Sequence, residues 1–196
     1  MKSFDKSHTV LNIGMSAIAP NLYFIPKIEK THNIKIISTI EKEELLIKKL
    51  KEGIYDLIFI TNKININKCI SKKIFYEHLY FFVSKTHPLA KKETLTFKEM
   101  DGESFLMNRE VGFWDVLVRE NMPNSHFILQ DNLDNLRILI DNSTISSFAS
   151  NLTLNERIVP NRISIPINNK NAIVDFYLTY KKSIDKKIVK LFFNIQ

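Results

Sequence analysis

The stretch EKEELLIKKLKEGIYDLIFIT (residues 41–61) predicts an amphipathic helix that leads directly into a buried strand. Leu46, Ile47 and Leu50 recur on one side, acidic residues come early, lysines come late, and Gly53 follows where helices commonly end in glycine. Residues 56–61 form a nearly continuous apolar run, which is typical of a parallel strand covered on both faces. A helix followed by such a strand is part of a βαβ unit.

The segments before residue 41 extend this pattern toward the N-terminus. Residues 10–14 and the β-branched run at 34–40 predict two strands. Between them we expect a helix that begins near Pro20, whose fixed φ angle suits a first helical turn, and that bends at Pro26. The first third of the chain therefore predicts a βαβαβ arrangement.

The rest of the chain alternates strands and helices again, which predicts a second α/β unit. Thr96 and Glu99 have the spacing of a capping box, so we expect a short helix after Thr96. The expected strands are residues 75–84, 104–107, 126–130, 144–149, 162–167 and 173–180, and the other expected helices are 113–121, 132–140 and 185–195.

Composition and charge place the chain among ordinary globular proteins: 44% of its 196 residues are hydrophobic and 25% are charged. The net charge of +7 raises the question of nucleic-acid binding. However, residues 100–169 carry a balance of −4, without a lysine, and lysines elsewhere are scattered between apolar positions. We therefore favour solvated lysines over direct nucleic-acid contact, and we expect the acidic middle to be a separate structural unit.

Several classes of protein are disfavoured by what the sequence contains. The single cysteine, Cys69, cannot form an internal disulfide, and we interpret it as an inert thiol; redox sensing would need an intermolecular partner. We expect no metal site, no cofactor and no enzyme activity, because no nucleophile has a base at a recognisable spacing and the chain has four glycines. The start resembles no signal peptide and no stretch approaches the ~20 apolar residues of a membrane span, so we expect a cytoplasmic protein without a membrane partner.

Three motifs in order resemble the effector-binding domain of LysR-type transcriptional regulators. They are LNIGMSAIAPNLYFIPKIEK (11–30), ELLIKKLKEGIYDLIFI (44–60) and FYEHLYFFVSKTHPLAKKETLTFKEM (75–100). The resemblance implies an α/β fold of the periplasmic-binding-protein-like type 2, in which two Rossmann-like subdomains are joined by two crossover strands. We expect subdomain I to comprise residues 1–84 and 165–196, and subdomain II to comprise 85–164.

The resemblance also implies function. We expect a small-molecule effector, anionic in character, in the cleft between the subdomains, and a homodimer, which would become a tetramer in the full-length protein. The family's N-terminal winged helix-turn-helix is absent from this sequence, so we expect the chain to be the sensing region of a longer regulator that contacts DNA only through that domain. A transport solute-binding protein and a small-molecule enzyme on the same two-lobed scaffold stay open as alternatives.

One segment departs from the family pattern. In NSTISSFAS (142–150), Asn142, Thr144 and Ala149 stand where the family usually has Gly, Gly and Pro. Because that loop lies near the ligand in the family, its chemistry cannot be carried over to this chain.

The candidate ligand-binding residues follow the predicted strands, because open α/β sheets bind ligands beyond the carboxyl ends of their strands. Ser16 and Ala17 leave room near the first helix, although Ser16 could instead cap that helix. Thr61 and Asn62 end the buried strand, and Arg109 could clamp an anion or pair with a nearby acid. Asn132 is expected to cap a helix first and to act as a donor second. The full set is Ser16, Ala17, Thr61, Asn62, Asn108, Arg109, Asn132, Ser146 and Ser147.

Overall fold

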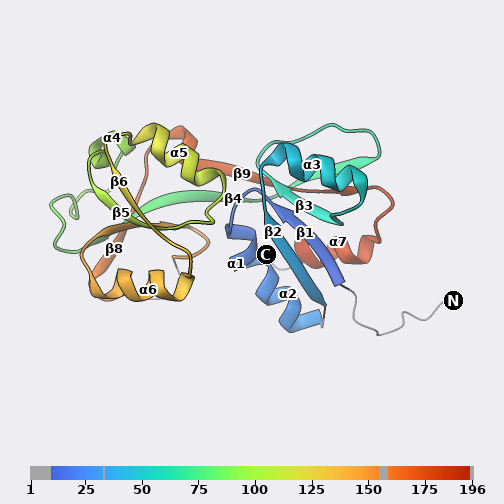
Figure 1. Cartoon of the computed structure of the whole chain (residues 1–196), viewed down its shortest axis with the longest axis horizontal. Helices are drawn as coiled ribbons and strands as arrows, with labels where there is room; N and C mark the ends of the chain where they lie inside the picture. Colours follow the sequence, from blue (N-terminus) through green and yellow to red (C-terminus); the bar gives the residue numbers. More distant parts are fainter. Residues whose placement is uncertain (1–9, 33, 155–158, 195–196) are drawn as a thin grey trace. The chain divides into compact units, whose positions relative to one another are not determined.

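The computed structural model describes residues 10–32, 34–154 and 159–194. These residues fold into two compact units (Figure 1): the described residues up to Phe75 and from Asp175 onward form unit 1, and those between Tyr76 and Val174 form unit 2. Each unit is a sheet with helices packed on it, so the predicted α/β class is confirmed.

Unit 1 contains the predicted βαβαβ arrangement. Strand β1 pairs in parallel with both β2 and β3, and β9 pairs antiparallel with β3, which gives the order β2-β1-β3-β9. The elements are β1 (Val10–Met15), α1 (Ala19–Tyr23), α2 (Ile25–His32), β2 (Lys35–Ile40), α3 (Glu43–Glu52), β3 (Leu57–Ile60), β9 (Ile173–Lys181) and α7 (Lys186–Phe193).

The helices of unit 1 begin and end where local chemistry requires. The single helix expected after Pro20 is divided at Phe24 into α1 and α2, and Pro26 is the second residue of α2. Helix α3 ends at Gly53, whose φ of +81° lies in the left-handed region and whose N–H donates to the Leu50 carbonyl. All four residues of β3 are buried, as the continuous apolar run predicts.

Unit 2 repeats the alternation. Strand β5 pairs in parallel with β6 and β7, whereas β4 pairs antiparallel with β7 and β8. The capping box at Thr96 and Glu99 is confirmed at the start of the short helix α4. The elements are β4 (Cys69–Ser84), α4 (Phe97–Met100), β5 (Ser104–Asn108), α5 (Phe113–Asn121), β6 (His126–Gln130), α6 (Leu133–Asn142), β7 (Ser146–Ser150), β8 (Arg162–Pro166) and the 3₁₀ turn η1 (Lys170–Ala172).

Two strands, β4 and β9, carry the chain from one unit to the other. Strand β4 has 16 residues and begins at Cys69, six residues before the predicted start at residue 75. The prediction missed this first part because the polar residues 71–73 interrupt its apolar pattern. The compact units divide inside these strands, at 75/76 and 174/175, whereas the boundaries expected from the sequence were 84/85 and 164/165.

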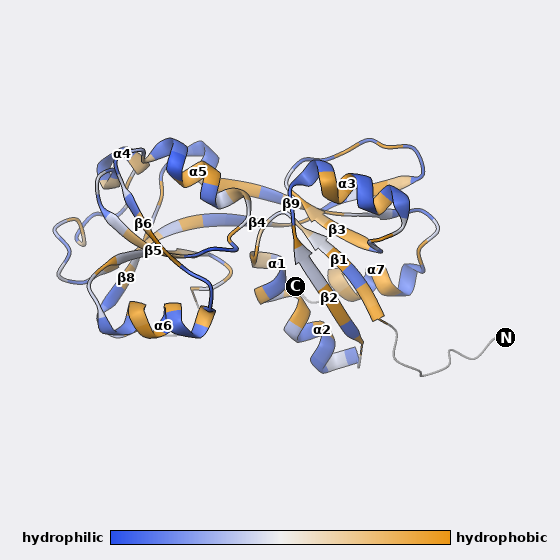
Figure 2. Cartoon of the chain, viewed as in Figure 1, coloured by the Kyte–Doolittle hydropathy of each residue, from blue (hydrophilic) through white to orange (hydrophobic). Residues whose placement is uncertain are grey.

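Each unit has its own core, in which phenylalanine rings pack among aliphatic side chains. In unit 1, the rings of Phe75 and Phe176 stack with centroids 4.6 Å apart, and in unit 2 those of Phe105 and Phe148 stack at 4.8 Å. Helices α3 and α6 show alternate hydrophobic and hydrophilic bands (Figure 2), as helices that cover one face of a sheet do.

Candidate functional site

In unit 1, the register of the sheet brings two predicted site segments to one edge. Met15 of β1 pairs with Phe59 of β3, so Ser16 and Thr61 follow neighbouring parallel strands at their carboxyl ends. The Ser16 N–H donates to the Phe59 carbonyl at 3.0 Å, and the side chains of Ser16 and Ala17 are buried. The structure therefore brings these two segments together at the edge where α/β sheets bind ligands.

The capping role considered for Ser16 is wrong. The N-cap of α1 is Ile18, which provides no side-chain hydrogen bond. The Ser16 residue is 3% exposed, and its Oγ is a buried polar atom without a hydrogen-bond partner among the described residues. A buried hydroxyl without a partner costs free energy, and such a group calls for a functional or solvent-mediated explanation.

The donors at the end of β3 bind a carboxylate that sequence reasoning missed. Glu43 Oε1 accepts hydrogen bonds from the Thr61 N–H and from the Thr61 hydroxyl, the latter at 2.6 Å. Its other oxygen accepts from Asn62 Nδ2 at 3.0 Å. The sequence signal for Glu43 was interpreted only as a favourable charge at the start of α3, and nothing in the pattern shows the contact with Thr61.

In unit 2, Asn108 ends β5 and is buried. Its side chain donates to the Gln130 carbonyl at 3.2 Å and accepts from the Glu110 N–H at 2.8 Å. The neighbouring Arg109 side chain makes an exposed ion pair with Asp131, which is the alternative that the sequence left open for it. Asn108 is thus held in place by the backbone that surrounds the end of the sheet.

Asn132 caps helix α6, as predicted. Its side-chain oxygen accepts from the Asp134 N–H at 2.8 Å and from the Asn135 N–H at 3.0 Å. This residue is exposed and follows β6, so it lies at the same edge of the unit 2 sheet as Asn108. The cap is confirmed, whereas contact with a ligand stays a prediction.

Ser146 and Ser147 begin β7 and are not at that edge. They pair with Phe105 and Leu106, which precede Asn108 on the parallel strand β5. Both serines are buried, and the Ser147 hydroxyl donates to the Leu106 carbonyl at 2.8 Å. The additional hydrogen bonding expected of this segment is therefore made within the sheet, at least by Ser147.

A buried carboxyl group on β4 was missed by the sequence. Glu77 is 5% exposed and accepts a hydrogen bond of 2.8 Å from Trp114 Nε1 on α5. Burial raises the pKa of the Glu77 carboxyl above its ordinary value of 4.5, while Trp114 and the nearby Ser150 hydroxyl oppose that rise. The signal in the sequence was a lone acid at an inward-facing position of the apolar run 75–84.

The NSTISSFAS loop, which departs from the family pattern, is held by Arg162. Arg162 is 6% exposed. Its guanidinium donates to three carbonyls in and beside the loop, those of Ile140, Ser143 and Ile145, and to the carbonyl of Phe82 on β4. Burial lowers the pKa of Arg162, and Asp141 opposes that effect. A hollow of about 980 Å³ in unit 2 is lined by this loop together with Arg162 and Asn161. It lies at the amino end of β7, away from Asn108.

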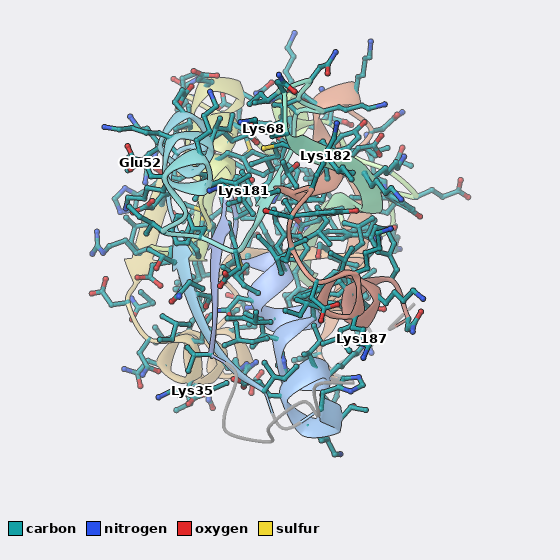
Figure 3. All side chains as sticks on the ribbon, turned by 90° about the vertical axis from the view of Figure 1, so that its right-hand side faces the viewer. Lys35, Glu52, Lys68, Lys181, Lys182 and Lys187 are labelled. Atoms are coloured by element: carbon teal, nitrogen blue, oxygen red, sulfur yellow. The ribbon has the colours of Figure 1, made fainter. Side chains whose placement is uncertain are left out.

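The lysines of unit 1 include a group on adjoining turns. Figure 3 shows Lys68, Lys181 and Lys182 on one side of the unit, and the Lys182 N–H donates to the Lys68 carbonyl at 2.8 Å. The Lys181 ammonium lies near Gly53 at the carboxyl end of α3, where a positive charge is favourable. The preference for solvated lysines over nucleic-acid contact stays a prediction.

Within residues 10–32, 34–154 and 159–194, no group of three or more His, Cys, Asp or Glu side chains could hold a metal ion. No helix in the same ranges combines the length and the apolar character that a membrane span requires.

Comparison with known proteins identifies one family. A family model described as the LysR substrate binding domain matches residues 7–194. The uncharacterized HTH-type transcriptional regulator YybE of Bacillus subtilis (strain 168) is 36% identical over 62 residues, which are 32% of this chain. The matched stretch is 21% of that regulator, so the chain matches only about a fifth of this curated relative.

Solved structures agree with the fold. The reduced OxyR regulatory domain from Pseudomonas aeruginosa has a TM-score of 0.70 at 16% identity, with 95% of this chain and 96% of that chain covered. A full-length OxyR variant from the same organism has a TM-score of 0.71 at 16% identity, with coverage of 100% and 67%. The BenM effector binding domain with its effector benzoate has a TM-score of 0.65 at 15% identity, with coverage of 95% and 90%. The predicted periplasmic-binding-protein-like type 2 fold is confirmed.

Proposed function

Since the chain belongs to the family of LysR substrate-binding domains, we propose that it senses a small-molecule effector at the strand ends of its two units. The observation that carries the proposal is the unsatisfied Ser16 hydroxyl, buried at the carboxyl ends of parallel strands in a chain matched by that family from residue 7 to 194. A hydroxyl in this position gains a hydrogen bond when a polar ligand group reaches it.

The site residues of the proposal are those that end strands at these edges. They are Ser16, Ala17, Thr61, Asn62, Asn108, Arg109 and Asn132. The other two candidates, Ser146 and Ser147, begin β7 and lie away from this edge. BenM, which shares the fold, was solved with benzoate as its effector, and this supports a small organic molecule for the present chain. Arg109 and the Thr61–Asn62 pair already bind acidic side chains of the chain, and this argues against the anionic effector expected from the sequence.

The mechanism that we propose is a population shift. An effector that binds one arrangement of the two units more tightly than another increases the population of the first arrangement. Strands β4 and β9, which carry the chain between the units, are the segments through which such a change would act. In a full-length regulator this change would alter the geometry of a dimer or tetramer.

The partners follow from the same proposal. We propose a homodimer of this domain, a tetramer for the full-length protein, DNA contact through a separate N-terminal domain, and a location in the cytoplasm. The family and the similar structures are domains of transcriptional regulators rather than enzymes, and this favours sensing over a solute-binding protein or an enzyme.

A thermal-shift screen tests the proposal. The chain is heated with a library of small metabolites and aromatic compounds, and each hit is confirmed by calorimetry. We expect at least one compound to raise the Tm with one-to-one binding, and the matched variant Ser16→Val to weaken that binding. If no compound binds, or if Ser16→Val binds every hit as tightly as the wild type, the proposed site is wrong.

A further inference from the structure

The Glu43 carboxylate is bound in the way that proteins bind the carboxylate of a ligand. One oxygen accepts from both the N–H and the hydroxyl of Thr61, and the other accepts from the Asn62 amide. Three donors on two oxygens satisfy most of the capacity of a carboxylate. The two residues that supply them are those predicted from the sequence to contact an effector.

The binding of Glu43 does not depend on a cation. None of the ion pairs found in the described ranges involves Glu43. Glu43 is the first residue of the ten-residue helix α3, and the positive end of the helix dipole adds to the three hydrogen bonds. Neutral donors and a helix start therefore hold the charge.

The neighbouring Glu44 provides an internal comparison. It shares the first turn of α3 with Glu43 and carries the same charge, but it is exposed. None of the hydrogen bonds at Thr61 or Asn62 reaches it. Thr61 and Asn62 therefore bind Glu43 rather than Glu44 because of where their donors lie at the end of β3, and not because of charge alone.

We propose that Thr61 and Asn62 form a carboxylate-binding site that the chain fills with its own Glu43, and that Glu43 thereby sets which chemical class of effector this edge accepts. The second part rests on the proposed function. A carboxylate that arrives here meets occupied donors and a like charge, whereas an amine or an amide N–H meets an acceptor. The effector group at this edge is therefore a hydrogen-bond donor, neutral or cationic, rather than an acid.

Unit 2 supplies an independent observation of the same kind. Arg109, the side chain best suited to clamp an anion in that unit, already pairs with Asp131. This pair is exposed, so it contributes little to the stability of the fold. It reduces the free energy that Arg109 contributes to the binding of an anionic ligand, because the ligand has to displace Asp131. Arg109 and the Thr61–Asn62 pair, all predicted ligand-binding residues, are thus each matched with an acid of the chain itself.

Chemical rescue tests the first part of the proposal. The variant Glu43→Ala empties the site, while Glu44→Ala is the matched control with the same change of charge in the same helical turn. The Tm of each variant and of the wild type is measured in sodium acetate and in sodium chloride of equal ionic strength, and again with acetamide. We expect Glu43→Ala to lower the Tm by about 3–6 °C, as expected from the loss of hydrogen bonds to a charged acceptor in a domain of this size.

The expected result is that acetate restores part of that loss in Glu43→Ala alone, and that acetamide restores less. An equal effect of acetate on all three proteins would overturn the carboxylate-binding site. If Glu43→Ala does not fold, amide NMR of the wild type and of Glu43→Gln decides instead. The Thr61 N–H donates to the Glu43 carboxylate, so its amide resonance should move upfield in Glu43→Gln, whose amide oxygen is a weaker acceptor; an unchanged Thr61 resonance would overturn the proposal.

A paired screen tests the effector class. Each scaffold is supplied once as its carboxylate and once as its amine, and wild type, Glu43→Ala and Glu44→Ala are compared. We expect wild-type hits among the amines, and a change of preference toward carboxylates in Glu43→Ala alone. Carboxylate hits that Glu43→Ala leaves unchanged would overturn the assignment of class. If nothing binds any of the proteins, the proposed sensing function fails, whereas the acetate experiment still decides whether Thr61 and Asn62 bind a carboxylate.

Discussion

Trp114 Nε1 on α5 donates a hydrogen bond of 2.8 Å to the carboxyl group of Glu77 on β4, and both side chains are buried. Trp114 is the only tryptophan in the chain, so its fluorescence reports directly on this contact. Burial disfavours the ionised form of Glu77 and raises its pKa above 4.5.

The sign of the resulting pH dependence follows from linkage. Because the pKa of Glu77 is higher in the folded than in the unfolded chain, the folded state holds the proton over a pH range in which the unfolded state has released it. The stability contributed by this group is present below pH 4.5 and is lost as the pH rises through the raised pKa. Each unit of difference between the folded and unfolded pKa changes the free energy of unfolding by about 1.4 kcal/mol.

We predict that Glu77→Gln removes this pH dependence. The amide oxygen of Gln can still accept from Trp114, and the side chain no longer ionises. Chemical denaturation above pH 4.5 should show a decline of stability with pH in the wild type that is smaller in Glu77→Gln, and the Trp114 emission should lose its pH dependence in Glu77→Gln alone. Glu110→Gln, an exposed acid of the same unit, is the control. Parallel pH profiles for all three proteins would contradict the prediction.

A second pH-dependent prediction concerns Glu99 in the capping box of α4 and the stability of the chain at low pH. The Lys92 ammonium, followed by the backbone and hydroxyl of Thr96, lowers the pKa of Glu99 to about 2. Its stabilising contribution is present above pH 4.5 and is lost as the pH falls toward 2. Glu99→Gln should therefore make the Tm less sensitive to acid than the wild type, whereas the exposed neighbour variant Glu93→Gln should not. The same dependence of Tm on low pH in Glu99→Gln and Glu93→Gln would contradict the role of Glu99.

The core beneath β1 leaves no room for a side chain at Gly14. A Cβ placed there would lie 2.5 Å from Leu46 Cδ2 and 2.9 Å from the Tyr55 ring. We predict that Gly14→Ala lowers the free energy of unfolding by about 1–3 kcal/mol through overpacking. In a double-mutant cycle with Leu46→Ala, the double variant should lose less free energy of unfolding than the sum of the losses in the two single variants, because removing the Leu46 side chain relieves the clash. Strict additivity would show that the contact with Leu46 is not the cause.

Arg162 should be essential for the loop that departs from the family pattern. Its guanidinium satisfies four carbonyl groups, and three of them, those of Ile140, Ser143 and Ile145, lie at the end of α6 and before β7. We predict that Arg162→Met lowers the free energy of unfolding by roughly 3 kcal/mol or more, because the buried carbonyl groups lose their hydrogen-bond donor. Arg162→Lys should recover little, since an ammonium cannot reproduce the planar fork. Urea denaturation measures both, and full stability of Arg162→Met would contradict this role.

The order of elements could be predicted because it depends on local patterns. The periodicity of 41–61, the glycine at position 53 and the capping box at Thr96 each decide a segment by nearby residues, and each is present in the structure. The start of β4 was missed because the polar residues 71–73 follow Cys69 and Ile70, so no apolar alternation marks this part of the strand.

The contacts at the candidate site could not be predicted for a different reason. Thr61 and Asn62 were placed correctly at the end of a strand, but the acid that binds them is 18 and 19 residues away along the chain. The Glu77–Trp114 pair is separated by 37 residues. Such pairs depend on the tertiary fold, and single-sequence patterns carry no information on which side chain arrives there.

The most direct test of effector sensing is amide NMR of the labelled chain, titrated with a compound that raises the Tm in the thermal-shift screen. We predict saturable shifts that concentrate at Ser16 and Thr61 in unit 1 and at Asn132 in unit 2. Shifts confined to residues remote from these strand ends, or to the lysines around Lys68 and Lys182, would contradict the account.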